Sequence, residues 1–259
     1  MHSVYDSGNR KFCLYITIKC TGKKVLRVWA EDYGKKNSKY ADRQIEVNGE
    51  RTIYFSFPVS PKQLFLGVVN VSDPQDKNFE VSLQEGSLKT YNIWTDEQTN
   101  DFLDLLIPFC QVCGFKGATP KGVPYENGDF QIMYYDVIRD GASGNPISTP
   151  ARIGHRSGKI DISKARYDNY TIPMRVMIGL HEFSHKYKNP KIGLDISNEI
   201  GADINGLYIY LGLGFSKIDA ICVFANVFLR AQTPENINRM RKINDYIFKF
   251  ENQEFAKLN

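Results

Sequence analysis

The residues with the clearest chemical potential lie in one pentapeptide, His181-Glu182-Phe183-Ser184-His185. On an α-helix, residues four positions apart lie one above the other on the same face, so the two imidazoles would be stacked. Two stacked imidazoles can bind one Zn²⁺ ion, and the glutamate between them would lie beside that ion without binding it. From that place Glu182 can act as a general base toward a water molecule. The pentapeptide therefore predicts a catalytic zinc site.

The segment around the pentapeptide carries the signals of a buried helix. Thr171 is a suitable N-cap, Pro173 falls in the first turn, and Asn189-Pro190 would end the helix. Between these two ends, apolar residues lie on both flanks of the predicted helix. This pattern is typical of a helix that is buried on more than one side. A buried imidazole needs a polar partner, and a metal ion would satisfy both histidines.

A catalytic zinc site needs a further protein ligand, because such sites use three and leave the fourth position open. No histidine follows His185, so the third ligand is expected to be a carboxylate. Glu199 and Asp203 are again four residues apart on one face of a predicted helix. We expect Glu199 to bind the metal and Asp203 to accept the free N–H of a ligating histidine. Two alternatives stay open, in which Asp195 or Asp203 binds the metal in place of Glu199.

The order of these motifs resembles that of the gluzincin metallopeptidases, in which HExxH is followed by an E-x-x-A-D motif. The segment from Thr233-Pro234 to Arg239 is similar to the lower lobe of the CAAX-processing and heat-shock membrane gluzincins, here without their membrane spans. The resemblance covers about residues 91–259 and implies a minimal, soluble zincin-like metallopeptidase domain. Its substrates would be proteins or peptides.

The combined motifs imply a mechanism for peptide hydrolysis. His181, His185 and Glu199 would hold Zn²⁺, and Glu182 would take a proton from water and pass it to the leaving amine. The oxyanion that develops on the peptide carbonyl usually needs one more hydrogen-bond donor. The sequence offers four candidates for this donor and does not choose among them: His155, Tyr208, Tyr210 and Arg239.

The predicted secondary structure changes from strands alone to a mixture of helices and strands near residue 91. Thr95-Asp96-Glu97-Gln98 has the pattern of a capping box and opens a predicted helix, which predicted strands and the HExxH helix then follow. We therefore divide the chain into residues 1–90 and 91–259. Lys159–Ile162 directly precedes the HExxH helix and is expected to be the edge strand along which an extended peptide substrate pairs.

Residues 1–90 have the pattern of a small all-β domain. Short segments rich in aromatic and β-branched residues alternate with turn signals. Asn48-Gly49 lies between two such segments and predicts a type I′ hairpin. We expect a β-sandwich accessory domain that contributes no chemistry of its own. Together with the second domain, this predicts an α+β fold.

Composition narrows the class of protein. The 259 residues are 42% hydrophobic and 24% charged, as in ordinary globular proteins. The net charge of +4 comes without a dense basic tract, so no nucleic-acid partner is expected. Charged residues interrupt the first twenty positions, and no apolar stretch is long enough to span a membrane. We therefore expect a cytoplasmic protein, or one that is not secreted by a classical signal.

Five cysteines in a chain without an export signal are expected to be reduced thiols. Cys110 and Cys113 form a single C-x-x-C motif without a second pair, so packing at a helix end is favoured over redox or metal chemistry.

Two other functions compete with an active zinc endopeptidase. The chain could be a binding or structural protein with a vestigial zinc site, or a zinc hydrolase that acts on other bonds. Retention of Glu182 argues against a vestigial site, because a structural zinc site needs no base.

Overall fold

A computed structural model describes residues 2–35, 38–91, 93, 95–189, 198–228 and 233–251 of the chain. The protein has an α+β fold, as predicted, with one antiparallel and one mixed sheet. The chain divides into two compact units. The first contains residues 1–90 together with Gly214–Ser216, and the second contains the remaining residues from Tyr91 onward.

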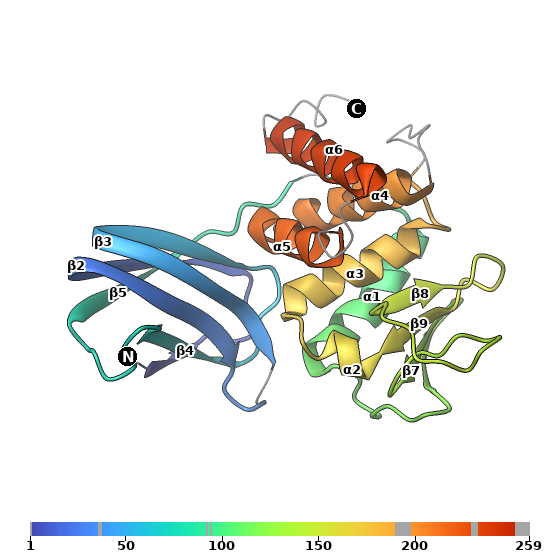
Figure 1. Cartoon of the computed structure of the whole chain (residues 1–259), viewed down its shortest axis with the longest axis horizontal. Coiled ribbons are helices and arrows are strands. Elements are labelled where there is room, and N and C mark those ends of the chain that lie inside the picture. Colours follow the sequence, from blue (N-terminus) through green and yellow to red (C-terminus); the bar gives the residue numbers. More distant parts are fainter. Residues whose placement is uncertain are drawn as a thin grey trace. The chain divides into compact units, whose positions relative to one another are not determined.

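The first unit is built on a single antiparallel sheet of five strands (Figure 1). Its hydrogen-bonded order is β1-β4-β2-β3, and β5 also pairs with β2. Alternate residues of β2, such as Leu14, Ile16 and Ile18, are fully or almost fully buried, so one face of the sheet forms the core of the unit. The strands are β1 (His2–Asp6), β2 (Phe12–Asp32), β3 (Lys39–Phe57), β4 (Gln63–Asn70) and β5 (Phe79–Gly86).

Hydrogen bonding joins all five described strands in one sheet, and the expected sandwich stays a prediction. The length of β2 allows this single sheet, because the strand pairs with two different strands on the same side. The first half of β2 pairs with β5 through Cys13–Cys20, and its second half pairs with β4 through Leu26–Asp32. Both halves pair with β3 on the other side.

The predicted hairpin turn at Asn48-Gly49 is wrong. These residues lie within β3, where Gly49 pairs with Cys20 and Asn48 pairs with Lys23 across an irregularity in register. Gly49 has φ +79° and Gly22, on the opposite strand, has φ +74°. A glycine with positive φ suits a bulge as well as a tight turn, so the local signal is correct about backbone conformation and wrong about chain reversal.

The second unit contains a mixed sheet of four strands in the order β6-β7-β9-β8. Strand β9 pairs parallel to β7 and antiparallel to β8. The predicted edge strand at Lys159–Ile162 is therefore an inner strand, and β8 forms the edge instead. The strands are β6 (Val123–Asn127), β7 (Phe130–Tyr135), β8 (Ala151–Ile153) and β9 (Ile160–Ser163).

Six helices complete the described part of the second unit. Helix α3 contains the HExxH motif and packs against α1, α4, α5 and the edge strand β8 (Figure 1). The helices are α1 (Glu97–Val112), α2 (Lys164–Tyr167), α3 (Ile172–Ser184), α4 (Asn198–Gly212), α5 (Lys217–Phe228) and α6 (Pro234–Glu251). None of these described helices is long and apolar enough to cross a membrane.

Helix α3 starts as predicted and ends earlier than predicted. Thr171 is its N-cap and a proline falls in the first turn, whereas the last helical residue is Ser184 and His185 is the C-cap. Of the expected stop signal, Pro190 lies outside the described residues. Every residue of α3 is buried except His181, which is half-buried and opens toward a cleft. The helix therefore holds its polar motif in an apolar surrounding.

Candidate metal centre

Helices α3 and α4 approach each other closely because of small and polar residues on α4. A Cβ atom on Gly206 would lie 3.0 Å from the carbonyl carbon of Leu180 and 3.1 Å from the His181 nitrogen. Glycine thus allows α4 to contact the backbone of α3 directly. The fully buried Asn205 donates from Nδ2 to Ser184 Oγ over 2.8 Å, and its Oδ1 accepts the N–H of Asn189 over 2.7 Å. These contacts fix the end of α3 against α4.

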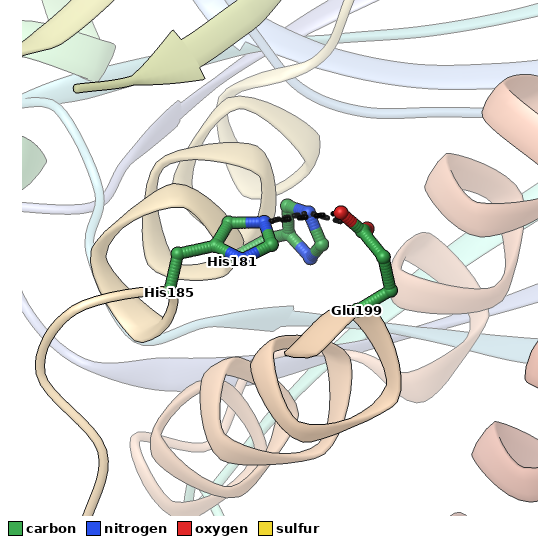
Figure 2. Close-up of side chains that lie close together, drawn as sticks. All are labelled: His181, His185 and Glu199. Carbon is green, nitrogen blue, oxygen red and sulfur yellow. Dashed lines mark hydrogen bonds and ion pairs between the residues drawn. The ribbon is translucent and has the colours of Figure 1, made fainter. Parts of the chain in front are cut away.

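This packing brings the imidazole of His181 in α3, that of the C-cap His185 and one carboxylate from α4 together (Figure 2). The Nε2 atoms of His181 and His185 are 3.2 Å apart, and each lies 3.7 Å from a carboxylate oxygen of Glu199. Tetrahedral zinc with bonds of about 2.0–2.1 Å separates its ligand atoms by about 3.3 Å. The three donors therefore fit a zinc ion in both spacing and chemical type.

Asp203 lies on the side of the His181 ring that faces away from His185 and Glu199. Its Oδ1 is 2.9 Å from His181 Nδ1, and the residue is fully buried. Since Nδ1 and Nε2 are on opposite sides of the ring, Asp203 can orient the imidazole while Nε2 stays directed at Glu199. The supporting role of Asp203 stays a prediction, and this distance is the one that it requires. The alternative ligand Asp195 lies outside the described residues.

Glu182 is buried beside the two histidines and faces the edge strand. The backbone N–H of Ile153 in β8 interacts with its carboxylate. Burial raises the pKa of Glu182, as does the negative charge of Glu199, while His181 opposes the shift. A carboxyl group with a raised pKa is a better proton acceptor and donor near neutral pH. Burial thus adapts Glu182 to the role of a base.

The two histidines differ in their electrostatic surroundings. Burial lowers the pKa of His181, but the carboxylates of Asp203, Glu182 and Glu199 together outweigh burial and raise the pKa above its ordinary value. Burial and the proximity of His181 lower the pKa of His185 to about 4. His185 is therefore held in the neutral form, which is the form that binds metals.

The donors open into a cleft of about 330 Å³ within the second unit. Edge strand β8 and the loop after it line one part of the cleft, and α3, α4, α5 and α6 line the rest. Its apolar lining consists mainly of Pro150, Ala151, Ile153, Met177, Ile178, Val223 and Phe224, and its polar lining includes His155, Glu182 and Arg239.

Two of the four candidate oxyanion donors line the cleft, and two do not. His155 and Arg239 line the cleft, and the ring of His155 lies 5.7 Å from that of His185. Tyr208 packs against Phe250, and Tyr210 is fully buried. Neither tyrosine is among the described residues that line the cleft. The structure therefore brings only the first pair to the site.

Three functional features escape the sequence analysis. Asn205 joins α3 to α4, the Ile153 N–H binds Glu182, and Arg239 contacts the carboxylates of Glu199 and Asp203. The sequence gives a signal only for Arg239, through the T-P-x-x-x-x-R segment at the start of α6. The other two contacts depend on how distant segments meet, which no local pattern records.

The C-x-x-C motif lies away from the cleft, at the end of α1. Cys110 is buried, and Cys113 lies 2.9 Å from the Tyr134 hydroxyl and 2.7 Å from an Asp168 oxygen. Burial raises the pKa of Cys110 to about 12 and that of Cys113 to about 11, so both remain protonated thiols.

Comparisons of the chain with protein families, with curated proteins and with solved structures found no match.

Proposed function

We propose that the second unit is a zinc-dependent endopeptidase of gluzincin type. The observation that carries this proposal is the convergence of His181, His185 and Glu199 at ligand spacing, with Glu182 buried beside them. A structural zinc site would need a fourth protein ligand and no base. Here the described donors number three, and the adjacent carboxylate has a raised pKa. This combination supports a hydrolytic site.

Zn²⁺ held by these donors would act as a Lewis acid that lowers the pKa of water and polarises the peptide carbonyl. Glu182 accepts one proton from the attacking water and then donates it to the nitrogen of the leaving amine. The Ile153 N–H keeps the Glu182 carboxylate oriented during both transfers. His155, which lines the cleft beside His185, is the candidate donor to the developing oxyanion.

Edge strand β8 supports the choice of a peptide as the substrate. The Pro150 carbonyl accepts the Ser163 N–H of β9, and the Gly154 N–H donates to the carbonyl of Lys159, which directly precedes β9. The alternating backbone groups of Ala151 and Ile153 therefore point away from β9. The Ala151 carbonyl accepts the Thr149 hydroxyl, and the Ile153 N–H binds Glu182. We infer that an extended peptide pairs with the two groups left, the Ala151 N–H and the Ile153 carbonyl.

The test compares wild-type protein with Glu182→Gln, both loaded with zinc, on a mixture of fluorogenic peptides. The wild type should cleave peptides, and Glu182→Gln should retain zinc but lose at least about 10²-fold in turnover. Glu97→Gln, the same change on the exposed first turn of α1, is the matched control and should retain full activity. Zinc binding by the wild type without turnover of any peptide would favour a vestigial site instead.

A further inference from the structure

Arg239 is a buried cation that α6 brings to the metal centre from the far end of the chain. The helix begins at Pro234, and the Asn236 N–H donates to the Thr233 hydroxyl over 3.2 Å. This cap fixes where the helix starts, and Arg239 follows in the second turn. Arg239 is only 8% exposed, which is unusual for an arginine unless its charge is paired.

The guanidinium of Arg239 contacts two carboxylates of α4. Its Nε and Nη2 donate to the two oxygens of Asp203 over 2.8 and 2.9 Å, which is a paired, fork-like contact. Its Nη2 also lies 3.0 Å from Oε2 of Glu199. One side chain therefore binds both the candidate metal ligand Glu199 and the residue that supports the candidate ligand His181.

The charges around the cleft give this contact its importance. Glu182, Glu199 and Asp203 place three carboxylates close together, and such a group would repel itself without cations. Among the described residues that line the cleft, only one other arginine or lysine is present, Arg152. Arg152 is 2.9 Å from Asp161 of β9 and is 44% exposed, so its charge is already paired. Arg239 and one divalent cation would balance the three carboxylates.

We propose that Arg239 is a positioning residue of the metal centre, which holds Glu199 and Asp203 in the arrangement that binds the ion. This inference rests on the zinc site of the proposed function. The guanidinium also repels the cation, an effect that alone would weaken metal binding. Positioning outweighs this repulsion because loss of Arg239 leaves the fully buried Asp203 without its paired donors.

The test measures the zinc dissociation constant of the full chain by competition with a chromophoric chelator. Arg239→Gln should weaken zinc binding by about 10–100-fold, as loss of other groups that orient metal ligands does. Arg239→Lys keeps the charge but cannot form the fork, so it should lie between this variant and the wild type. Arg241→Gln, on the same helix but exposed, is the matched control and should stay within about twofold of the wild type.

The absorption spectrum of the Co²⁺-substituted protein gives a second readout, because its bands report the ligand geometry rather than the stability of the fold. The spectrum should shift in Arg239→Lys and stay unchanged in Arg241→Gln. If Arg239→Gln does not fold, Arg239→Lys decides alone. Unchanged or tighter zinc binding with an unchanged Co²⁺ spectrum would overturn the positioning role. A wild-type chain that binds no zinc would instead refute the proposed function.

Discussion

Gly206→Ala should separate the two helices that carry the metal donors. The added Cβ would lie 3.0 to 3.1 Å from three backbone atoms of Leu180 and His181. Non-bonded carbon atoms normally lie about 3.5–4.0 Å apart, so α4 must move away from α3 by about 0.5 Å. Glu199 moves with α4, and its present separation of 3.7 Å from each histidine nitrogen would grow. A tetrahedral zinc ion needs about 3.3 Å there.

The magnitude follows from two opposing effects. Overpacking of this kind costs about 1–3 kcal/mol, while replacing glycine by alanine returns about 1 kcal/mol in helix propensity. The free energy of unfolding without metal should therefore fall by less than about 2 kcal/mol. The helix propensity of alanine does not raise zinc affinity. A loss of about 1–2 kcal/mol in the free energy of zinc binding corresponds to about 5–30-fold weaker binding.

The assay combines chelator competition for zinc with urea unfolding of the metal-free protein. Gly212→Ala on the same helix is the control for overpacking itself, because its Cβ would lie 2.4 Å from side-chain atoms of Ile93, at the end of α4 opposite Glu199 and away from the α3 backbone. This control should leave zinc affinity within about twofold of the wild type. Wild-type zinc affinity in Gly206→Ala would refute the view that close backbone packing sets the donor spacing.

Three further predictions concern other parts of the second unit. Glu199→Ala should abolish stoichiometric zinc binding, whereas Asp203→Ala should retain zinc with about 10–100-fold lower affinity, as metal analysis after dialysis would show; the reverse pattern would make Asp203 the ligand. Arg175→Met should lower the free energy of unfolding by about 2–4 kcal/mol in urea titrations, because the buried guanidinium donates to three backbone carbonyls. With a thiol reagent at pH 8, the exposed Cys222 should react well before Cys110, since burial raises the pKa of Cys110 to about 12 and little thiolate forms below that pH; equal rates would contradict this.

Much of the centre could be predicted from the sequence because its key features are local. The spacing of His181 and His185 fixes their relation on one helix, and the spacing of Glu199 and Asp203 does the same on the next. The N-cap of α3 at Thr171 is likewise read from neighbouring residues. Helical periodicity needs no knowledge of distant contacts, which explains these agreements.

The incorrect predictions concern pairing between distant segments. The sequence of Lys159–Ile162 is compatible with an edge or an inner strand, and only its pairing with both β7 and β8 decides between them. Asn48-Gly49 favours positive φ, but the partner strand decides whether the chain turns or bulges there. The predicted oxyanion role of Arg239 fails to anticipate its fork with Asp203 for the same reason. Long-range register is set by tertiary packing, which short patterns do not encode.

The most direct test of the metal centre is zinc X-ray absorption spectroscopy of the zinc-loaded full chain. The proposed ligands predict two imidazole nitrogens at about 2.0–2.1 Å, together with oxygen neighbours at about 2.0–2.2 Å, and no sulfur. A sulfur neighbour at about 2.3 Å would contradict the proposed ligands, because it would place a cysteine on the metal. A third imidazole would also contradict them, because it would fill the position that the hydrolytic water needs.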